Sequence, residues 1–501
     1  MSFRRLSPFA YGLVAVAAAA AVYLPVTRGY FFADDFVWLL HFRDWPMLRA
    51  LTFPFGGHAL LLRNVVFYAS WSLFGLWPEP YHWTLFLTHL ANVGLLFVLL
   101  RRLTGSVHLA CLGGLLWGTS PLCAGTVAWY SVYGHALVGT ILLVVLCQVV
   151  RVREPSLRDG VGWFLLLLAG VLCFGVGVGI GMTFPATLFL LRPEAWRHRL
   201  LRVLFLLLPV AIVGLYFGYR RVAAAIAPFT FAEQYIVAQA AAPPWAGLAM
   251  VGHLLGVGTA GLLLGIFSAP LVYPGGAARA ALIAAGVGVV LALLIGDARG
   301  RRQLLASLVL ALGGYGTIAL GRANFYAAAH WALPAAARQP RYHYAAMLPV
   351  TMAVCVLLQQ LTRWRPLRLL VPLVVPLWLV GATMAFVTTP WRVEGGDTAR
   401  VAVADVRHGI DALIDATPPG APVSIPNLPL NQAVLGAALA PADFPGWAGL
   451  FALFYPADVV RGHRVVFVER DARLLAAVRA GDDPRLAALL VSRAAAPGGT
   501  P

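Results

Sequence analysis

Long apolar runs, separated by short arginine-bearing loops, occupy the first 390 residues of the chain. A helix that crosses a bilayer needs about 20 mainly apolar residues, because each residue advances the helix by about 1.5 Å. The pattern therefore predicts an all-α polytopic membrane protein with about 11 transmembrane helices, within a range of about 11–13. The predicted crossings are residues 9–26, 83–100, 107–127, 136–150, 161–174, 179–191, 200–217, 278–295, 304–320, 345–361 and 367–387.

Two further apolar segments affect the number of predicted crossings. Residues 60–77 carry Arg63, Asn64 and Ser70, and we interpret them as an amphipathic helix on the outer surface. Residues 245–267 are rich in glycine and lead to two prolines, and we interpret them as re-entrant or interfacial. Counting either segment as a crossing would move the arginine loops that follow it to the other side of the membrane.

Arginine clusters between the apolar runs set the predicted orientation, because cytoplasmic loops carry an excess of basic residues. With the N-terminus inside, eleven crossings put the C-terminal part outside, together with the outer loop 27–82 and residues 218–274 and 321–344. The first run has the shape of a cleavable signal peptide, but the many spans after it favour an uncleaved first helix. The clusters are Arg101 and Arg102, then residues 151–158, 192–202, 299–302 and 363–368.

The composition changes after residue 390, where the apolar runs end. A helical pattern covers residues 398–416, strand-like patterns cover 422–427 and 464–469, and another helix begins at Ala472. The sequence thus predicts a transmembrane domain over residues 1–390 and a small extracytoplasmic α/β domain over 391–501. We expect the tail after Ala494 to be disordered.

The composition supports a membrane protein and argues against other classes. Of the 501 residues, 60% are hydrophobic and 11% are charged, with a mean hydropathy of +0.80. The formal net charge of +17 comes from arginine alone, gathered in loops as membrane topology requires, so nucleic-acid binding is not expected. The five cysteines lie in apolar stretches without metal-like spacing, which indicates neither disulfides nor zinc.

An acidic pair, Asp34 and Asp35, follows the first predicted crossing directly. Charged groups within a membrane region cost free energy, so carboxylates at this position need a reason. Neighbouring side chains point in different directions, so the two cannot share one substrate atom. We assign Asp34 as the base that takes the proton of an acceptor hydroxyl, and Asp35 as a helix cap, arginine partner or metal ligand. The alternative, in which both residues only cap the helix that begins at Phe36, stays open.

The motifs around this pair resemble the GT-C superfamily of polyprenyl-phosphate-sugar-dependent glycosyltransferases. They are most similar to bacterial relatives of the O-mannosyltransferases that carry tetratricopeptide repeats. Asn64 stands where that family usually has proline, Pro340 stands where some members have glutamate, and no such repeats follow. The matching elements, within residues 20–105 and 320–390, are Asp34-Asp35, Leu60-Leu61-Leu62-Arg63, Phe74-Gly75, Tyr81-His82, His89-Leu90-Ala91-Asn92 and Arg341-Tyr342-His343-Tyr344.

The resemblance implies an inverting transfer of a sugar from a polyprenyl phosphate to a hydroxyl-bearing acceptor, which is a glycan, lipid or protein. The reaction would take place at the outer face of a bacterial cytoplasmic membrane. Arginine suits the leaving phosphate because its planar donors grip phosphate in bidentate fashion. The implied site has Asp34 and Asp35 as catalytic residues, Arg341, Arg322 and Arg63 as donor-phosphate contacts, and His58, His82 and Tyr342 as substrate contacts.

Other interpretations of these residues stay open. The three arginines could instead contact lipid headgroups. His89 and Asn92 favour a structural contact between helices, and the glycine-rich residues 175–181 favour close helix packing over phosphate binding. No cofactor is certain, and a divalent metal on Asp34 or Asp35 with His58, His82 or Glu79 is left open. A lipid or solute transporter or flippase and an inactive scaffold are the rival functions.

Overall fold

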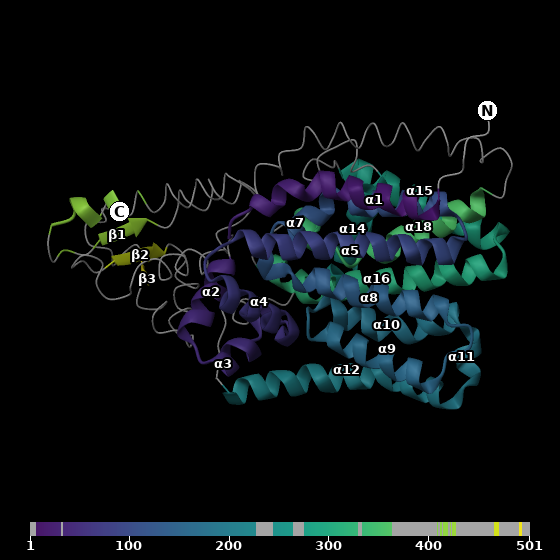
Figure 1. Cartoon of the computed structure of the whole chain (residues 1–501), viewed down its shortest axis with the longest axis horizontal. Coiled ribbons are helices and arrows are strands. Elements are labelled where there is room, and N and C mark those ends of the chain that lie inside the picture. The colour runs from purple at the N-terminus through teal and green to yellow at the C-terminus, as the bar shows by residue number, and fades with distance from the viewer. Residues whose placement is uncertain are drawn as a thin grey trace.

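The computed structural model describes residues 7–31, 34–226, 244–263, 275–328 and 333–362, and in the C-terminal part residues 408, 411–412, 414–418, 421, 423–426, 465–469 and 490–492. The first five ranges form a bundle of helices (Figure 1). The predicted crossing at 367–387 and the domain boundary at 390 lie outside the described residues.

Helices occur at each predicted crossing that falls within the described residues. Six of the helices there are long and apolar enough to cross a membrane, or seven if one bent pair counts as a span. The protein is therefore a multi-pass membrane protein, while the number eleven stays a prediction. The helices of the bundle are α1 (Pro8–Tyr23), α5 (Glu79–Thr104), α6 (Val107–Gly118), α8 (Gly134–Arg151), α9 (Leu157–Val171), α10 (Val176–Leu191), α12 (Arg199–Ile226), α15 (Gly275–Ile295), α16 (Ala298–Ala328) and α18 (Met347–Leu361).

The predicted crossing 107–127 is broken in the structure. Helix α6 ends at Gly118, and the chain continues through η3 (Pro121–Cys123) into α7 (Ala124–Val127) with a bend of 52°. Proline lacks the backbone N–H that a continuing helix needs, so Pro121 begins a new element there. This confirms the kink that the proline predicts.

Side-chain hydrogen bonds bring several arginine-bearing loops to one end of the bundle. Gln303 Nε2 donates to the carbonyl of Leu103 at 3.2 Å, and Gln359 Nε2 donates to that of Thr104 at 2.7 Å. Arg192 Nε donates to the carbonyl of Val149 at 2.7 Å. We call this the arginine end; it carries Arg101, Arg102, Arg151, Arg192, Arg299, Arg301 and Arg302.

Short helices cover the opposite end, which Figure 1 shows at the left, far from α11 (Pro193–Arg197) at the arginine end. They are α2 (Asp34–Asp44), α3 (Met47–Thr52), η2 (Phe55–Gly57) and α4 (Leu61–Phe74), following η1 (Leu24–Arg28). Helix α4 buries Asn64 and Phe67 but leaves Leu73 75% exposed, as an amphipathic helix does. The amphipathic character predicted for 60–77 is therefore present. The same end receives η4 (Tyr130–Val132), α17 (Leu333–Ala336) and η6 (Pro340–Tyr342).

Helix α14 (Pro244–Leu263) lies in the segment predicted to be re-entrant or interfacial. By length and composition it could cross a membrane. However, a Cβ on Gly247 would lie 3.8 Å from Leu320, and one on Gly261 would overlap Leu122. Leu320 and Leu122 both belong to the half of the bundle away from the arginine end, so the contacts at both ends of α14 favour the interfacial interpretation.

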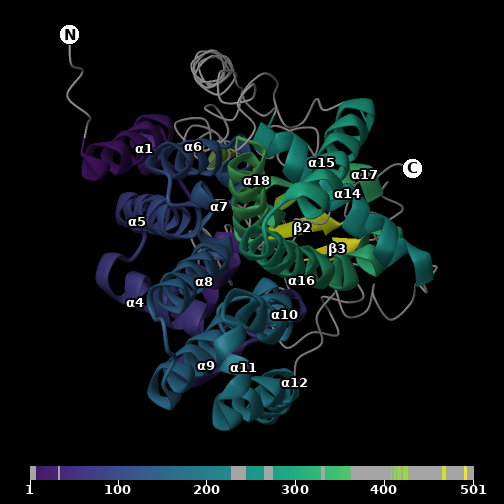
Figure 2. The same ribbon diagram turned by 90° about the vertical axis from the view of Figure 1, so that its right-hand side faces the viewer.

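Glycine allows helices α10 and α16 to approach closely. A Cβ on Gly179 would overlap Thr317 Oγ1 and the carbonyl of Gly313, and one on Gly177 would overlap the carbonyl of Gly170. The glycine-rich residues 175–181 therefore serve helix packing, as predicted. Figure 2, which looks along the bundle, shows α18 between the α1–α5–α6 group and the α14–α15 group.

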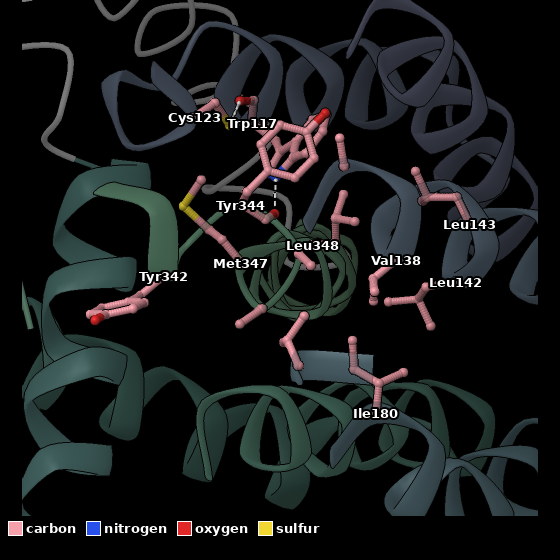
Figure 3. Packing of buried hydrophobic residues seen from close by; sticks show 14 of the residues in the cluster. Trp117, Cys123, Val138, Leu142, Leu143, Ile180, Tyr342, Tyr344, Met347 and Leu348 are labelled. Carbon is pink, nitrogen blue, oxygen red and sulfur yellow. Dashed lines mark hydrogen bonds between the residues drawn. The ribbon is translucent and has the colours of Figure 1, made fainter. Parts of the chain in front are cut away.

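Buried polar side chains around Tyr344 hydrogen-bond with one another and with the backbone. His89 contacts Tyr344 Oη at 3.0 Å through Nδ1 and the carbonyl of Gly118 at 2.9 Å through Nε2. Asn92 Nδ2 donates to Tyr344 Oη at 3.2 Å, and Figure 3 shows Trp117 donating to the Tyr344 carbonyl. These contacts agree with the structural role favoured for His89 and Asn92.

Three short parallel strands form a sheet of order β1-β2-β3 in the C-terminal part. β1 (Val423–Pro426) and β2 (Val465–Glu469) coincide with the two strand-like patterns, whereas β3 (Leu490–Ser492) was not predicted. Residues 414–416 are helical, inside the predicted helix 398–416. The helix predicted from Ala472 lies outside the described residues.

Candidate active site

Asp35 is fully buried and fixed by a segment nearly a hundred positions away. As the second residue of α2, its Oδ1 accepts hydrogen bonds from the Ser131 backbone N–H at 2.7 Å and from Ser131 Oγ at 2.5 Å. The Ser131 carbonyl in turn accepts from Arg63 Nε at 2.9 Å and Nη2 at 2.6 Å. Ser131 in η4 therefore connects the carboxylate of α2 to the guanidinium of α4.

Arg63 is occupied by the protein. Its Nη1 donates to Asn64 Oδ1 at 2.8 Å, and its guanidinium carbon lies 4.1 Å from the centre of a Trp38 ring. Burial lowers the pKa of Arg63, and the carboxylates of Asp35 and Asp34 act in the opposite direction. With 2% of the residue exposed, these contacts favour a structural role, and the assignment of Arg63 as a phosphate contact stays a prediction.

Asp34 differs from its neighbour. It is the first residue of α2 and is only half-buried, and its charge raises the pKa of Arg63 as that of Asp35 does. Negative charge is favourable in the first turn of a helix, so the capping interpretation also fits its position. The more accessible carboxylate of the pair is therefore Asp34.

Arg322 and His58 meet in a second group, which Arg63 links electrostatically to the acidic pair. Arg322 Nη2 lies 3.2 Å from His58 Nε2, although the residues are 264 positions apart. Desolvation is the main cause that holds the pKa of His58 well below its ordinary value, followed by the charges of Arg322, His135, Arg63 and Arg341. An imidazole surrounded by guanidinium groups resists a further positive charge.

The ring of His58 packs closely against the turn that contains Phe174 and Gly175. Its ring lies 4.4 Å from that of Phe174, centre to centre. A Cβ on Gly175 would overlap His58 Nδ1, so only glycine fits at this turn between α9 and α10. The first residue of the glycine-rich run thus supports a site residue as well as helix packing.

Arg341 is oriented by aromatic rings. Its guanidinium carbon lies 4.9 Å from the Trp129 ring centre and 5.3 Å from that of Tyr342. A Cβ on Gly125 would lie 2.7 Å from the Arg341 backbone nitrogen, so η6 packs directly on α7. Tyr342, predicted as a substrate contact, is buried and supports Arg341 from the same short element. Figure 3 shows Tyr342 pointing away from Trp117 and Tyr344.

His135 belongs with His58, Arg322 and Arg341, although the sequence did not predict this. It is 1% exposed, its ring lies 4.1 Å from that of Phe174, and it interacts electrostatically with Arg341 and Arg322. Neither ring nitrogen has a hydrogen-bond partner in the part of the chain that the structure describes. We call His58, His135, Arg322 and Arg341 the Arg–His cluster.

The segment 129–135 supplies Trp129, Ser131 and His135 to three different parts of the site. The available signal was a histidine at the start of a predicted crossing, directly after Tyr133 and Gly134. Without knowledge of its neighbours, such a histidine is more often a satisfied core residue.

His82 lies apart from the Arg–His cluster. Its Nε2 is 3.2 Å from the carbonyl of Tyr30, close in sequence to the acidic pair, and the ring is fully buried. Among the described residues, no three His, Cys, Asp or Glu side chains are grouped to hold a metal ion. The structure thus groups Asp34 and Asp35 with Arg63, and His58 with Arg322 and Arg341, and Arg63 interacts electrostatically with both groups.

This arrangement can bind an anion and take up a proton. Two guanidinium groups at the end opposite the arginine end offer planar donors for an oxyanion. Arg63 links them electrostatically to the carboxylates, since it acts on His58 and is itself acted on by Asp34 and Asp35. A half-buried carboxylate next to cations suits a general base for a hydroxyl group.

Comparisons with known proteins leave the family of the chain open. No protein-family model matches the chain, and no curated protein matches it significantly. Among solved structures, it is similar to a chain described as "Crystal Structure of ArnT from Cupriavidus metallidurans bound to Undecaprenyl phosphate". The identity is 14% over 97% of this chain and 90% of that chain, with a TM-score of 0.38. A TM-score this low does not establish a common fold.

Proposed function

We propose that the protein is a membrane glycosyltransferase that moves a sugar from a polyprenyl phosphate to a hydroxyl-bearing acceptor. The observation that carries the proposal is the electrostatic link, through Arg63, between the Arg–His cluster and the acidic pair at the end of the bundle opposite the arginine end. The resemblance of the motifs around both groups to the GT-C superfamily supplies the reaction class. The positive-inside rule assigns the arginine end to the cytoplasm and the site to the outer face of a bacterial inner membrane.

In the proposed reaction, the acceptor oxygen attacks the anomeric carbon of the donor from the side opposite the phosphate. The new carbon–oxygen bond forms as the bond to the phosphate oxygen breaks, so the configuration inverts. Asp34 takes the proton of the acceptor hydroxyl. Arg341 and Arg322 stabilise the negative charge that remains on the polyprenyl phosphate.

The decisive experiment is transfer by the purified protein from a panel of polyprenyl-phosphate sugars. We expect Asp34→Asn to lower kcat by about 10²–10⁴-fold, because this is the usual contribution of a positioned base. We expect Arg341→Gln to lower kcat/KM by about 10-fold or more, since a charge-assisted contact to phosphate is lost. Both variants should insert and purify as the wild type does.

The control is Asp44→Asn, which removes a carboxylate of α2 that pairs with Arg43 on the surface, at 2.6 Å. Its transfer rate should equal that of the wild type. Failure of every donor, together with a wild-type phenotype of Asp34→Asn in cells, would favour an inactive scaffold. Sugar-independent movement of the lipid across vesicles would favour the flippase.

A further inference from the structure

We propose that His135 is a third donor to the phosphate oxyanion that Arg322 and Arg341 bind. This inference rests on the proposed function, because it names a further residue of the donor site. The observation behind it is an imidazole that is 1% exposed and has no hydrogen-bond partner on either ring nitrogen within the described residues.

Buried polar groups in proteins are nearly always paired, and each exception calls for an explanation. His89 and His343 follow the rule at both ring nitrogens, whereas the Nδ1 atoms of His41 and His82 have no hydrogen-bond partner within the described residues. His89 is satisfied at both nitrogens, and His343 contacts Tyr315 Oη at 2.9 Å and the carbonyl of Ala337 at 2.8 Å. His135 lacks a partner at both nitrogens within the described residues, and like His58 it interacts electrostatically with Arg341 and Arg322.

The side chains around His135 indicate the chemical class of ligand that it would bind. Its ring packs on Phe174, which also contacts His58, and His58 is held by Arg322. An imidazole offers an N–H donor that needs an acceptor, and the adjacent guanidinium groups offer only donors. A ligand that accepts a hydrogen bond from His135 beside these cations should present acceptor oxygens and negative charge, which a phosphate group does.

Helix α8 places His135 for this role. The residue is the second of α8, directly after η4, and a Cβ on Gly134 would overlap the carbonyl of Cys173. The close approach of the two backbones fixes the start of α8 against the turn that carries Phe174. A glycine at 134 is thus what brings the imidazole to the Arg–His cluster.

Binding of farnesyl phosphate to the purified protein in dodecyl maltoside tests the inference. Farnesol and inorganic phosphate serve as the probes without phosphate and without lipid. We expect the wild type to bind farnesyl phosphate more tightly than either probe. His135→Phe, which keeps the ring packing on Phe174, should weaken that binding by about 10-fold or more, since a hydrogen bond to a charged group is lost.

His135→Asn keeps one donor, so its affinity should lie between those of the wild type and His135→Phe, and it serves as the test if His135→Phe does not fold. His108→Phe is the control, because His108 contacts Tyr11 on an exposed surface. Wild-type affinity for farnesyl phosphate in both His135 variants would overturn the inference. If the wild type binds farnesyl phosphate no better than farnesol, the proposed donor site itself fails. Equal affinity for inorganic phosphate, weakened by His135→Phe, would assign the site to free phosphate and overturn only the lipid donor.

Discussion

Two adjacent carboxylates have different surroundings because consecutive helical residues point in different directions. Asp35 is fully buried, and its contacts with Ser131 connect it to Arg63. Asp34 is half-buried at the start of α2. The sequence hypothesis of one reacting and one orienting carboxylate agrees with this division.

Asp35→Ala should destabilise the protein by roughly 3–5 kcal/mol, because it leaves the buried guanidinium of Arg63 without its nearest counter-charge. Thermal unfolding in detergent, followed by tryptophan fluorescence, would measure the loss. Asp44→Ala, which removes an exposed ion pair, should change the free energy of unfolding by about 0–1 kcal/mol. Equal melting temperatures of the two variants would argue against a structural role of Asp35.

The stability of the folded protein should depend on pH through His58. Its pKa in the folded protein lies well below the ordinary value of 6.5, so below that pH the unfolded chain binds the proton more readily. The contribution of His58 to the free energy of unfolding is therefore present above pH 6.5 and is lost as the pH falls below that value. His58→Asn, which keeps an acceptor for Arg322, should show a shallower fall in melting temperature between pH 7 and about pH 5 than the wild type. Identical slopes would contradict this assignment.

At the scale of elements, short turns between helices build the site. The turn 129–135 supplies Ser131 to the acidic pair, Trp129 to Arg341 and His135 to the Arg–His cluster. The turn before α10 supplies Phe174 and the space at Gly175 that His58 needs. The long helices hold these turns at fixed positions, so their packing controls the geometry of the site.

Close packing of α10 on α16 leads to a prediction about glycine. Gly179→Ala should destabilise the protein by about 1–3 kcal/mol, because the added methyl group meets the backbone of Gly313, which cannot move aside. Gly214→Ala in α12 is the matched control, since an added Cβ there has open space. That variant should be neutral or slightly stabilising, because alanine is the better helix former. Melting temperatures of the two variants would measure this difference, and equal values would contradict the prediction.

At the scale of the whole molecule, charge is segregated along the bundle. The arginine loops share one end, whereas Asp34, Arg322 and Arg341 belong to the other. By the positive-inside rule, this separation predicts which end of the bundle faces the cytoplasm. A transferase that uses lipid-linked sugars at the outer face needs such an arrangement.

Thiol labelling in intact cells would test the orientation. A membrane-impermeant maleimide should modify Asp44→Cys at the site end and leave Glu154→Cys at the arginine end unmodified until the cells are opened. The five native cysteines are buried and free, so they should give little background. Labelling of Glu154→Cys in intact cells would reverse the proposed orientation and remove the site from the outer face.

The sequence by itself determined the helices of the bundle, the kink at Pro121 and two of the three strands. Apolar run length, proline chemistry and alternation are local properties, and they act on the chain wherever it lies. The same local chemistry singled out Asp34 and Asp35, because charged groups beside apolar runs need a reason. The resemblance to the GT-C superfamily implied the roles of His58, Arg322 and Arg341.

Only the tertiary structure decided how these residues are paired. The resemblance assigned Arg63 to phosphate, whereas its contacts with Ser131, 68 positions away, favour a structural role. His135 could not be distinguished from a satisfied core histidine until the packing around it left both nitrogens without a partner in the described residues. Hydrogen bonds between distant segments depend on how helices pack in space, and hydropathy patterns record only whether each position is buried.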